Sequence, residues 1–581
     1  MKHLRRLLPY LRRHRRPYLL GMGLVVLATA CGLVAPLLLR DAVNRLEHHA
    51  TRAFILGVAG AIVLFAVVRG SLIFASRYAI LAASRRVEFE LRNDLFAHLE
   101  RLSARYYDTH ATGEITSRAI NDLEAVRMMI GIGIMSIAST GLFCAAALGV
   151  MFVVRWDLAS LCLLPLAGVS VVMAWTGARM HDLSLHVQSQ LGSLSSRAQE
   201  NYSGARVVRA FVQEENEKGR FADACDEYRR RNLRLARWRT GGWAAILILM
   251  DGAILLTLLV GGKAVIAGTM TKGDVAAFVA YQFQLLWPMI AIGWVISVIQ
   301  RGVACMGRLA EIFDARPDSD DARAVPLERP IEGRIELRSL TFAYAPDRPP
   351  ALRDVSLTIE PGQKVAIVGR TGSGKSTIVQ LLLRHYKVPE GALFVDGRDV
   401  NTIPLAELRR AVGTVPQDLF LFSDRLRENI AFGGVDGVSD EAVGRAAEIS
   451  RLSADLELFP ERLEQVIGER GITLSGGQRQ RTGLARALVR EPRILVLDDA
   501  LSSVDSHTER EIQDRLREYM RGRTCVLITH RLSAIRDADR IFVLEEGRLA
   551  EQGRHDDLVR SGGAYARLWE TQKLADELAA E

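Results

Sequence analysis

The chain has 581 residues, more than a single hydrophobic core usually holds, so several domains are expected. Hydrophobic residues make up 49% and charged residues 24%. Long apolar runs fill the first half, and short alternating runs with turns fill the second. The net charge of +8 does not indicate nucleic acid, because arginines gather at the N-terminus and between the apolar runs, as on the cytoplasmic side of a membrane protein. The six cysteines stand singly and predict neither a metal site nor disulfides.

The N-terminal half is predicted to be a membrane domain. Residues 1–16 are expected to form a short basic helix on the membrane surface, and a transmembrane domain follows over 17–303. Six apolar runs have about the 20 residues needed to cross a bilayer. They lie near 17–39, 53–77, 129–154, 158–177, 242–262 and 275–299.

Six spans place both termini on one side of the membrane. The long basic connections 83–128 and 178–241 place that side in the cytoplasm. We therefore expect a multi-pass protein of the plasma membrane, the inner membrane of a bacterial cell. The connections are charged and are predicted to continue the spans as helices. Each has a break at its tip, His110–Gly113 and Ser203–Gly204, where a short transverse helix is expected to press on another domain.

Two ionisable residues lie within the apolar runs, Asp251 in the fifth and Arg69 in the second. A charge at the middle of the bilayer costs about 2.5–3.5 kcal/mol, so each side chain should face a cavity or a partner. Asp251 is either a substrate-pathway residue that favours cationic cargo or part of a structural pair. The sequence leaves both interpretations open.

The C-terminal half is predicted to be a soluble domain over 334–570, with a linker over 304–333 before it and a tail over 571–581 after it. The linker is rich in proline, aspartate and arginine in its second part. Short apolar runs separated by helical stretches predict a parallel sheet that is covered on both faces.

The strongest motif follows the apolar run Lys364–Val368. It fits G-x-x-x-x-G-K-[ST] between a predicted strand and a predicted helix, the context that a phosphate-binding loop requires. Its residues are Gly369, Arg370, Thr371, Gly372, Ser373, Gly374, Lys375, Ser376 and Thr377. Lys375 is expected to reach the β- and γ-phosphates, and the Ser376 hydroxyl to face Mg²⁺. The chain is therefore predicted to bind a nucleotide.

Two further motifs point to phosphate chemistry. Asp498 ends the apolar strand Ile494–Leu497, at the edge where ligands bind in such sheets, and is expected to hold Mg²⁺ through water. Between the phosphate loop and this strand, a glycine pair opens a helix and offers a second phosphate contact. That motif consists of Leu474, Ser475, Gly476, Gly477 and Gln478.

With these motifs the chain resembles a half-transporter of the ATP-binding cassette (ABC) exporter family, and the likeness covers essentially the whole chain. The resemblance implies a multidomain fold. An all-α six-helix transmembrane domain with long cytoplasmic helical extensions is followed by an α/β P-loop (RecA-like) nucleotide-binding domain with antiparallel β and helical subdomains. It also implies ATP and Mg²⁺ as ligands, and a head-to-tail pair in which each ATP lies between one phosphate loop and the partner's signature motif, here Leu474–Gln478.

The resemblance assigns further roles by position. Tyr344 is similar to the aromatic residue that stacks on adenine, Gln417 to the glutamine that contacts the metal, and His530 to the histidine that contacts the γ-phosphate. Asp505 lies in a loop, Ser502–Asp505, that resembles the one crossing between paired domains. The segments implied to connect the two domains are Gly468–Gly471 and the tips near Thr112–Arg118 and Gly204–Phe211.

One position departs from the family pattern. The residue after Asp498 is usually Glu and acts as the general base for the attacking water, but here it is Asp499. Its carboxylate has a reach shorter by one C–C bond, about 1.5 Å. A misplacement of about 1 Å can cost on the order of a hundredfold in rate. We expect this site to bind ATP and hydrolyse it slowly, while the intact signature motif completes a partner's site.

This asymmetry resembles the degenerate-site subunit of a heterodimeric exporter, so a non-identical second half-transporter is the predicted partner. The alternatives are a homodimer with two equal, slow sites and an ATP-gated regulatory membrane protein without net pumping. The six spans argue against a soluble ATPase. The family's usual cargo is small amphipathic molecules, drugs or lipids, moved out of the cytoplasm or the inner leaflet of the lipid bilayer by alternating access.

Overall fold

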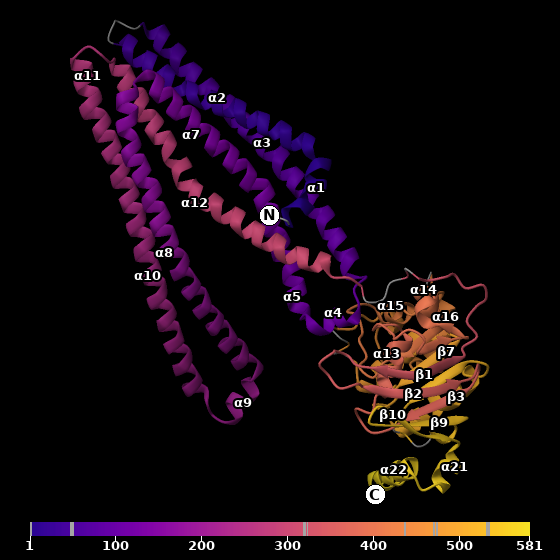
Figure 1. Cartoon of the computed structure of the whole chain (residues 1–581). Coiled ribbons are helices and arrows are strands. Elements are labelled where there is room, and N and C mark those ends of the chain that lie inside the picture. The colour runs from indigo at the N-terminus through magenta and orange to yellow at the C-terminus, as the bar shows by residue number, and fades with distance from the viewer. Residues whose placement is uncertain are drawn as a thin grey trace. The chain divides into compact units, whose positions relative to one another are not determined.

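The computed structural model describes residues 3–46, 51–317, 321, 323–434, 437–468, 471, 474–529, 531 and 535–580. The chain divides into two compact units. Unit 1 holds Met1–Glu100 and Thr112–Ala315, and unit 2 holds Arg101–Ala111 and Arg316–Glu581. Figure 1 shows that unit 1 is built from long helices, whereas unit 2 carries the sheets.

The described part of unit 1 contains six helices that are long and apolar enough to cross a membrane, as predicted. Four are continuous: α2 (Arg15–Leu46), α3 (Arg52–Leu99), α8 (Trp156–Ser203) and α12 (Lys272–Asp314). The third comprises α5 (Thr112–Ser117), η2 (Arg118–Asp122), α6 (Leu123–Met128), η3 (Met129–Gly133) and α7 (Ile134–Val154). The fifth comprises α10 (Glu214–Leu256), η4 (Thr257–Gly261) and α11 (Gly262–Ile266). Before them lie η1 (His3–Leu7) and α1 (Leu8–Arg13).

The helices extend well beyond a bilayer. Helices α3 and α8 have 48 residues each, so each is about 72 Å long at 1.5 Å per residue. The hydrocarbon core of a membrane is about 30 Å thick. The prediction that the connections continue the spans as helices is therefore confirmed. Helix α2 packs along α3, α8 packs along α10, and α12 contacts α2, α7 and α8.

The first tip differs from the prediction. Helix α3 ends at Leu99, and the short separate helix is α4 (Ala104–Thr109). Thr112, predicted to open a tip helix, instead begins the third long helix. The backbone is extended at Ser103 and at His110, so the chain breaks before and after α4. At the second tip, α9 (Ala205–Ala210) lies within the predicted range Gly204–Phe211.

Unit 2 is built on two sheets. The larger has the order β10-β9-β3-β8-β7-β6, with parallel pairing throughout except between β9 and β10. The smaller, β2-β1-β4-β5, is antiparallel. The strands are β1 (Ile335–Phe342), β2 (Leu352–Ile359), β3 (Lys364–Val368), β4 (Leu393–Val395), β5 (Arg398–Asp399), β6 (Val412–Val415), β7 (Ile494–Asp498), β8 (Thr524–Ile528), β9 (Arg540–Glu545) and β10 (Arg548–Gly553). The predicted fold class is confirmed.

Helices surround these sheets and complete the hydrophobic cores. Strands β7 and β8 are buried along their whole length, as expected for a parallel sheet covered on both faces. The predicted start of the linker, residue 304, lies inside α12, and the predicted end of the soluble domain, residue 570, lies inside α22 (Ala564–Ala580). The helices are α13 (Lys375–Leu382), α14 (Leu405–Ala411), α15 (Leu426–Ala431), α16 (Asp440–Ile449), α17 (Ser453–Leu456), α18 (Gly476–Leu488), α19 (Ser506–Tyr519), α21 (His555–Arg560) and α22 (Ala564–Ala580).

Candidate functional site

The phosphate loop joins β3 to α13. Gly369 (φ +151°) and Gly374 (φ +98°) both adopt backbone conformations that side chains disfavour. A Cβ on Gly369 would collide with the carbonyl oxygen of Leu544, and a Cβ on Gly374 would lie 2.7 Å from the carbonyl oxygen of Ala351. The loop therefore packs too closely on neighbouring backbone to accept a larger residue at either position.

Lys375 is buried at the start of α13. Its Nζ donates hydrogen bonds to the carbonyl oxygens of Gly369 (2.8 Å) and Arg370 (2.9 Å). Burial lowers the pKa of Lys375, and the neighbouring carboxylates of Asp498 and Asp499 oppose that shift. The ammonium group is thus held by the loop backbone in the pocket that Asp498 and Asp499 also line, where it can bind phosphate oxygens.

The residues of the loop fit a nucleotide phosphate. Ser373 Oγ is buried and has no hydrogen-bond partner among the described residues, so a phosphate oxygen would satisfy it. The possible Mg²⁺ ligands are also near one another, because Ser376, Gln417 and Asp498 all line the same pocket. Hydroxyl, amide and carboxylate oxygens are the ligands that Mg²⁺ prefers.

This pocket has a volume of about 260 Å³ and brings together most of the predicted ATP-site residues. Those that line it are Tyr344, Thr371, Gly372, Gly374, Lys375, Ser376, Thr377, Gln417, Asp498 and Asp499. Ala351 and Ile528 also line it. His530, which the resemblance places at the γ-phosphate, lies outside the described residues.

Asp498 and Asp499 differ in their surroundings. Asp498 is buried at the end of β7 and is paired in register with Ile528 of β8. Asp499 is half-buried, has a positive φ of 50° and donates its backbone N–H to the Ile528 carbonyl oxygen at 2.7 Å. Aspartate tolerates the left-handed region better than most residues. The direction in which the Asp499 side chain leaves the sheet is therefore fixed by the backbone.

Tyr344 belongs to a cluster of three aromatic rings. Its ring meets Phe342 at 5.1 Å and Tyr386 at 5.0 Å, both edge to face. Its hydroxyl lies 2.9 Å from Thr377 Oγ1 in α13. Tyr386 in turn donates a hydrogen bond to Asp108 of α4 at 2.5 Å. No motif in the sequence marks Tyr386 or Asp108, because their relationship depends on a contact across 278 positions of the chain.

The signature motif forms the start of α18. Ser475 is the N-cap, and its hydroxyl accepts from the Gln478 N–H while the Gln478 side chain accepts from the Ser475 N–H. The capping box uses the N–H groups of Ser475 and Gln478, and those of Gly476 and Gly477 between them, at the positive end of the helix, are the ones that can bind an anion. Leu474–Gln478 is not among the described segments that line the ATP pocket of this chain. Asp505 is the N-cap of α19, and its carboxylate accepts from the Thr508 N–H.

The two charges of the apolar runs have different surroundings in unit 1. Arg69 lines a cavity of about 620 Å³ together with Arg77, Ser136 and Gln284, which is the kind of environment expected for it. Asp251 is exposed on α10.

Comparison with known proteins identifies both halves of the chain. Residues 18–289 match the ABC transporter transmembrane region, and residues 352–502 match the ABC transporter family. The probable multidrug resistance ABC transporter ATP-binding/permease protein YheI of Bacillus subtilis is 34% identical over 96% of this chain and 95% of that protein. The ATP-dependent lipid A-core flippase of Chromobacterium violaceum is 34% identical over 98% and 97%. A bacterial Atm1-family ABC exporter with ATP bound superposes with a TM-score of 0.78 at 30% identity, covering 97% of this chain and 98% of that structure.

Proposed function

The chain belongs to the ABC transporter family, and on this premise we propose that it is one subunit of an ATP-driven exporter whose own ATP site hydrolyses ATP slowly. Its second unit is the ATPase domain of the family, in which hydrolysis is coupled to transport, and transporters of this kind function as dimers. The observation that carries the proposal is the convergence of Lys375, Asp498 and the short Asp499 side chain on one pocket, in a chain with six membrane-length helices.

The chain's own residues bind and orient ATP in this proposal. Tyr344 offers its ring to the adenine, because aromatic stacking needs only an accessible face. Lys375 and the loop N–H groups hold the phosphates. Ser376, Gln417 and Asp498 would hold Mg²⁺, which when bound neutralises charge on the β- and γ-phosphate oxygens.

Asp499 is the proposed general base, which would accept a proton from the attacking water. Its N–H bond to Ile528 and its left-handed backbone hold its Cα at the end of the sheet. The backbone therefore has little freedom to advance a side chain that is about 1.5 Å shorter than glutamate. Slow hydrolysis at this site follows from geometry, since the carboxylate itself is retained.

We propose a non-identical partner, whose own base is Glu and whose active site is completed by Ser475 and the N-terminus of α18. The alternative is a homodimer with two equal, slow sites. The two assemblies differ in one measurable property, because only the heterodimer gains a fast site when the second subunit is added.

The proposed cargo is a small amphipathic molecule. Relatives of this length carry the names of multidrug resistance proteins and lipid A-core flippases, and the membrane helices line a cavity with both apolar and polar walls. We further propose that both termini lie in the cytoplasm, because the basic residues gather on that side.

A transport assay tests the proposal. Inside-out vesicles that contain the chain and its partner should accumulate an amphipathic dye against its gradient when ATP is added, and Lys375→Ala should abolish this. Dye that only equilibrates on addition of ATP would indicate a gated pathway and contradict the exporter assignment.

A further inference from the structure

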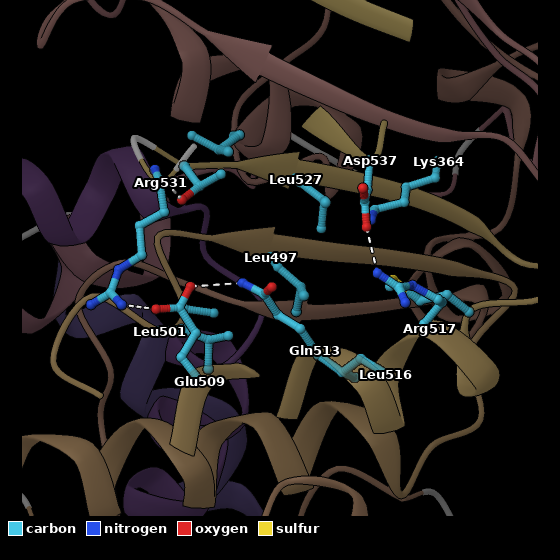
Figure 2. A pocket seen from close by; sticks show the side chains of 14 residues that line it. Lys364, Leu497, Leu501, Glu509, Gln513, Leu516, Arg517, Leu527, Arg531 and Asp537 are labelled. Atoms are coloured by element: carbon cyan, nitrogen blue, oxygen red, sulfur yellow. Dashed lines mark hydrogen bonds and ion pairs between the residues drawn. The ribbon is translucent and has the colours of Figure 1, made fainter. Parts of the chain in front are cut away.

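A small cavity lies between the strands β7 and β8 and the helix α19 (Figure 2). Its volume is about 60 Å³, and leucines from all three elements form its wall. An ion pair closes each end: Arg531 with Glu509 at one end, and Arg517 with Asp537 at the other. Ile528 lines both this cavity and the ATP pocket, so the two share a wall.

Arg531 holds the backbone of the loop Ser502–Asp505. One guanidinium nitrogen forms the ion pair with Glu509, and the other donates to the carbonyl oxygens of Ser502 (2.8 Å) and Val504 (3.1 Å). The planar fork of arginine suits this triple contact, whereas the ammonium group of lysine is a single point of charge.

Glu509 orients this arginine. It is 5% exposed, and Gln513 donates to its other oxygen at 2.7 Å. A buried carboxylate with both oxygens bound has little freedom to move, and its removal would leave Arg531 without its charged partner. Since Glu509 lies in the first turn of α19, which Asp505 caps, the loop, the helix and Arg531 form a closed set of contacts.

The same loop is also held by the signature helix. Gln480 of α18 donates to Ser502 Oγ at 2.8 Å and accepts from the Ser503 N–H at 2.8 Å. The loop is also bound to Asp499, since the Ser502 N–H donates to the Asp499 carbonyl oxygen at 3.3 Å. A shift of the loop would thus move both the proposed general base and the helix that carries the signature motif.

We propose that Arg531 is a positioning residue for ATP hydrolysis: together with Gln480 it fixes the loop Ser502–Asp505 and through it the position of Asp499. This inference rests on the proposed function, because it presupposes that ATP is hydrolysed at this pocket. Arg531 does not line the ATP pocket among the described residues, so it acts on the rate of the reaction rather than on nucleotide affinity.

The experiment separates rate from affinity in the purified full chain. Hydrolysis of γ-labelled ATP gives kcat and KM, and titration with a fluorescent ATP analogue gives Kd. We expect Arg531→Ala to lower kcat by about tenfold or more with Kd changed less than about twofold. Arg531→Lys should lie between Arg531→Ala and the unmodified chain, because one ammonium cannot hold the carboxylate and both carbonyls.

Arg517→Ala is the matched control. It removes the ion pair at the other end of the same cavity, where no contact to the loop exists among the described residues, and should leave kcat and Kd unchanged. Gln480→Ala should lower kcat, and its effect should not add fully to that of Arg531→Ala, because both act through one loop. If Arg531→Ala does not fold, the Gln480→Ala variant still tests whether the loop controls kcat.

Two results would overturn the inference. One is an Arg531→Lys or Gln480→Ala chain with unchanged kcat, and the other is an Arg517→Ala chain that loses as much activity as Arg531→Ala. Failure of the proposed function itself is recognised separately, because the unmodified chain would then not bind the ATP analogue.

Discussion

Within unit 2, the Tyr386 hydroxyl donates a hydrogen bond of 2.5 Å to Asp108 of α4, the short helix that lies in the sequence between two membrane-spanning helices. Burial, together with the Asp108 carboxylate, raises the pKa of Tyr386, so its proton stays in this bond at neutral pH. The ring of Tyr386 also contacts Tyr344. This arrangement connects the proposed adenine-stacking residue to a segment that is covalently continuous with the membrane domain.

We predict that Tyr386→Phe uncouples hydrolysis from transport. The substitution keeps the ring contact with Tyr344 and removes only the bond to Asp108, so ATP affinity should be unchanged while dye transport per ATP hydrolysed falls. Tyr519→Phe is the control, because it removes a similar hydroxyl bond, to Leu488, away from α4. Transport that remains fully coupled in Tyr386→Phe would show that this bond carries no signal.

The adenine contact is tested at Tyr344. Base–aromatic stacking contributes about 1–3 kcal/mol, so Tyr344→Ala should weaken ATP binding by roughly fivefold to more than a hundredfold. Tyr344→Phe keeps the ring, loses the contact with Thr377, and should bind almost normally. Titration with a fluorescent ATP analogue measures both, and equal affinities for the two variants would exclude stacking.

The tight path of the phosphate loop is tested at Gly374. Gly374→Ala places a Cβ 2.7 Å from the Ala351 carbonyl oxygen and should displace the loop, abolishing ATP binding. Gly522→Ala is the control, because its φ is also positive (+74°) but nothing lies within 4 Å of the new Cβ. It should cost about 1 kcal/mol of stability and leave ATP binding intact. Normal ATP affinity in Gly374→Ala would contradict this account of the loop.

Acid should destabilise the second unit through His385. Burial, with a smaller effect of Arg409, lowers the pKa of His385 to about 4, against about 6.5 when unfolded. Between these two pH values the unfolded chain therefore binds the proton more readily than the folded chain. The stability that neutral His385 contributes is fully present above pH 6.5 and is lost as the pH falls toward 4.

The measurement is the difference in thermal stability between the unmodified chain and His385→Asn as a function of pH. Asparagine keeps a donor for Gln380, which His385 contacts at 2.6 Å, but does not titrate. The stability advantage of the unmodified chain should shrink by up to a few kcal/mol below pH 6.5. A difference that does not change with pH would show that His385 is not held neutral.

Much of the fold could be predicted from local patterns. Six apolar runs of bilayer length predict the spans, and the run Ile494–Leu497 predicts a buried parallel strand, since burial and length are properties of a short segment. The short tip helix lies earlier in the chain than predicted, at α4 rather than at Thr112. The backbone is extended at His110, within the predicted break His110–Gly113, but a second break at Ser103, which no residue pattern marks, separates α4 from α3.

The site was predictable where the chemistry lies in consecutive residues, as in Gly369–Thr377. It was not predictable where side chains meet only in the folded chain. Arg531 reaches the carbonyls of Ser502 and Val504, and Tyr386 reaches Asp108, from distant parts of the sequence. Such contacts leave no pattern in a single sequence, because each partner alone is an ordinary arginine, tyrosine or aspartate.

The ATPase rate of the purified chain without a partner shows whether the short reach of Asp499 limits hydrolysis. We predict slow hydrolysis that Asp499→Glu raises by on the order of a hundredfold, with ATP affinity unchanged. Rapid, cargo-stimulated hydrolysis by the unmodified chain that Asp499→Asn abolishes would contradict this role of Asp499 and establish a homodimer with two competent sites.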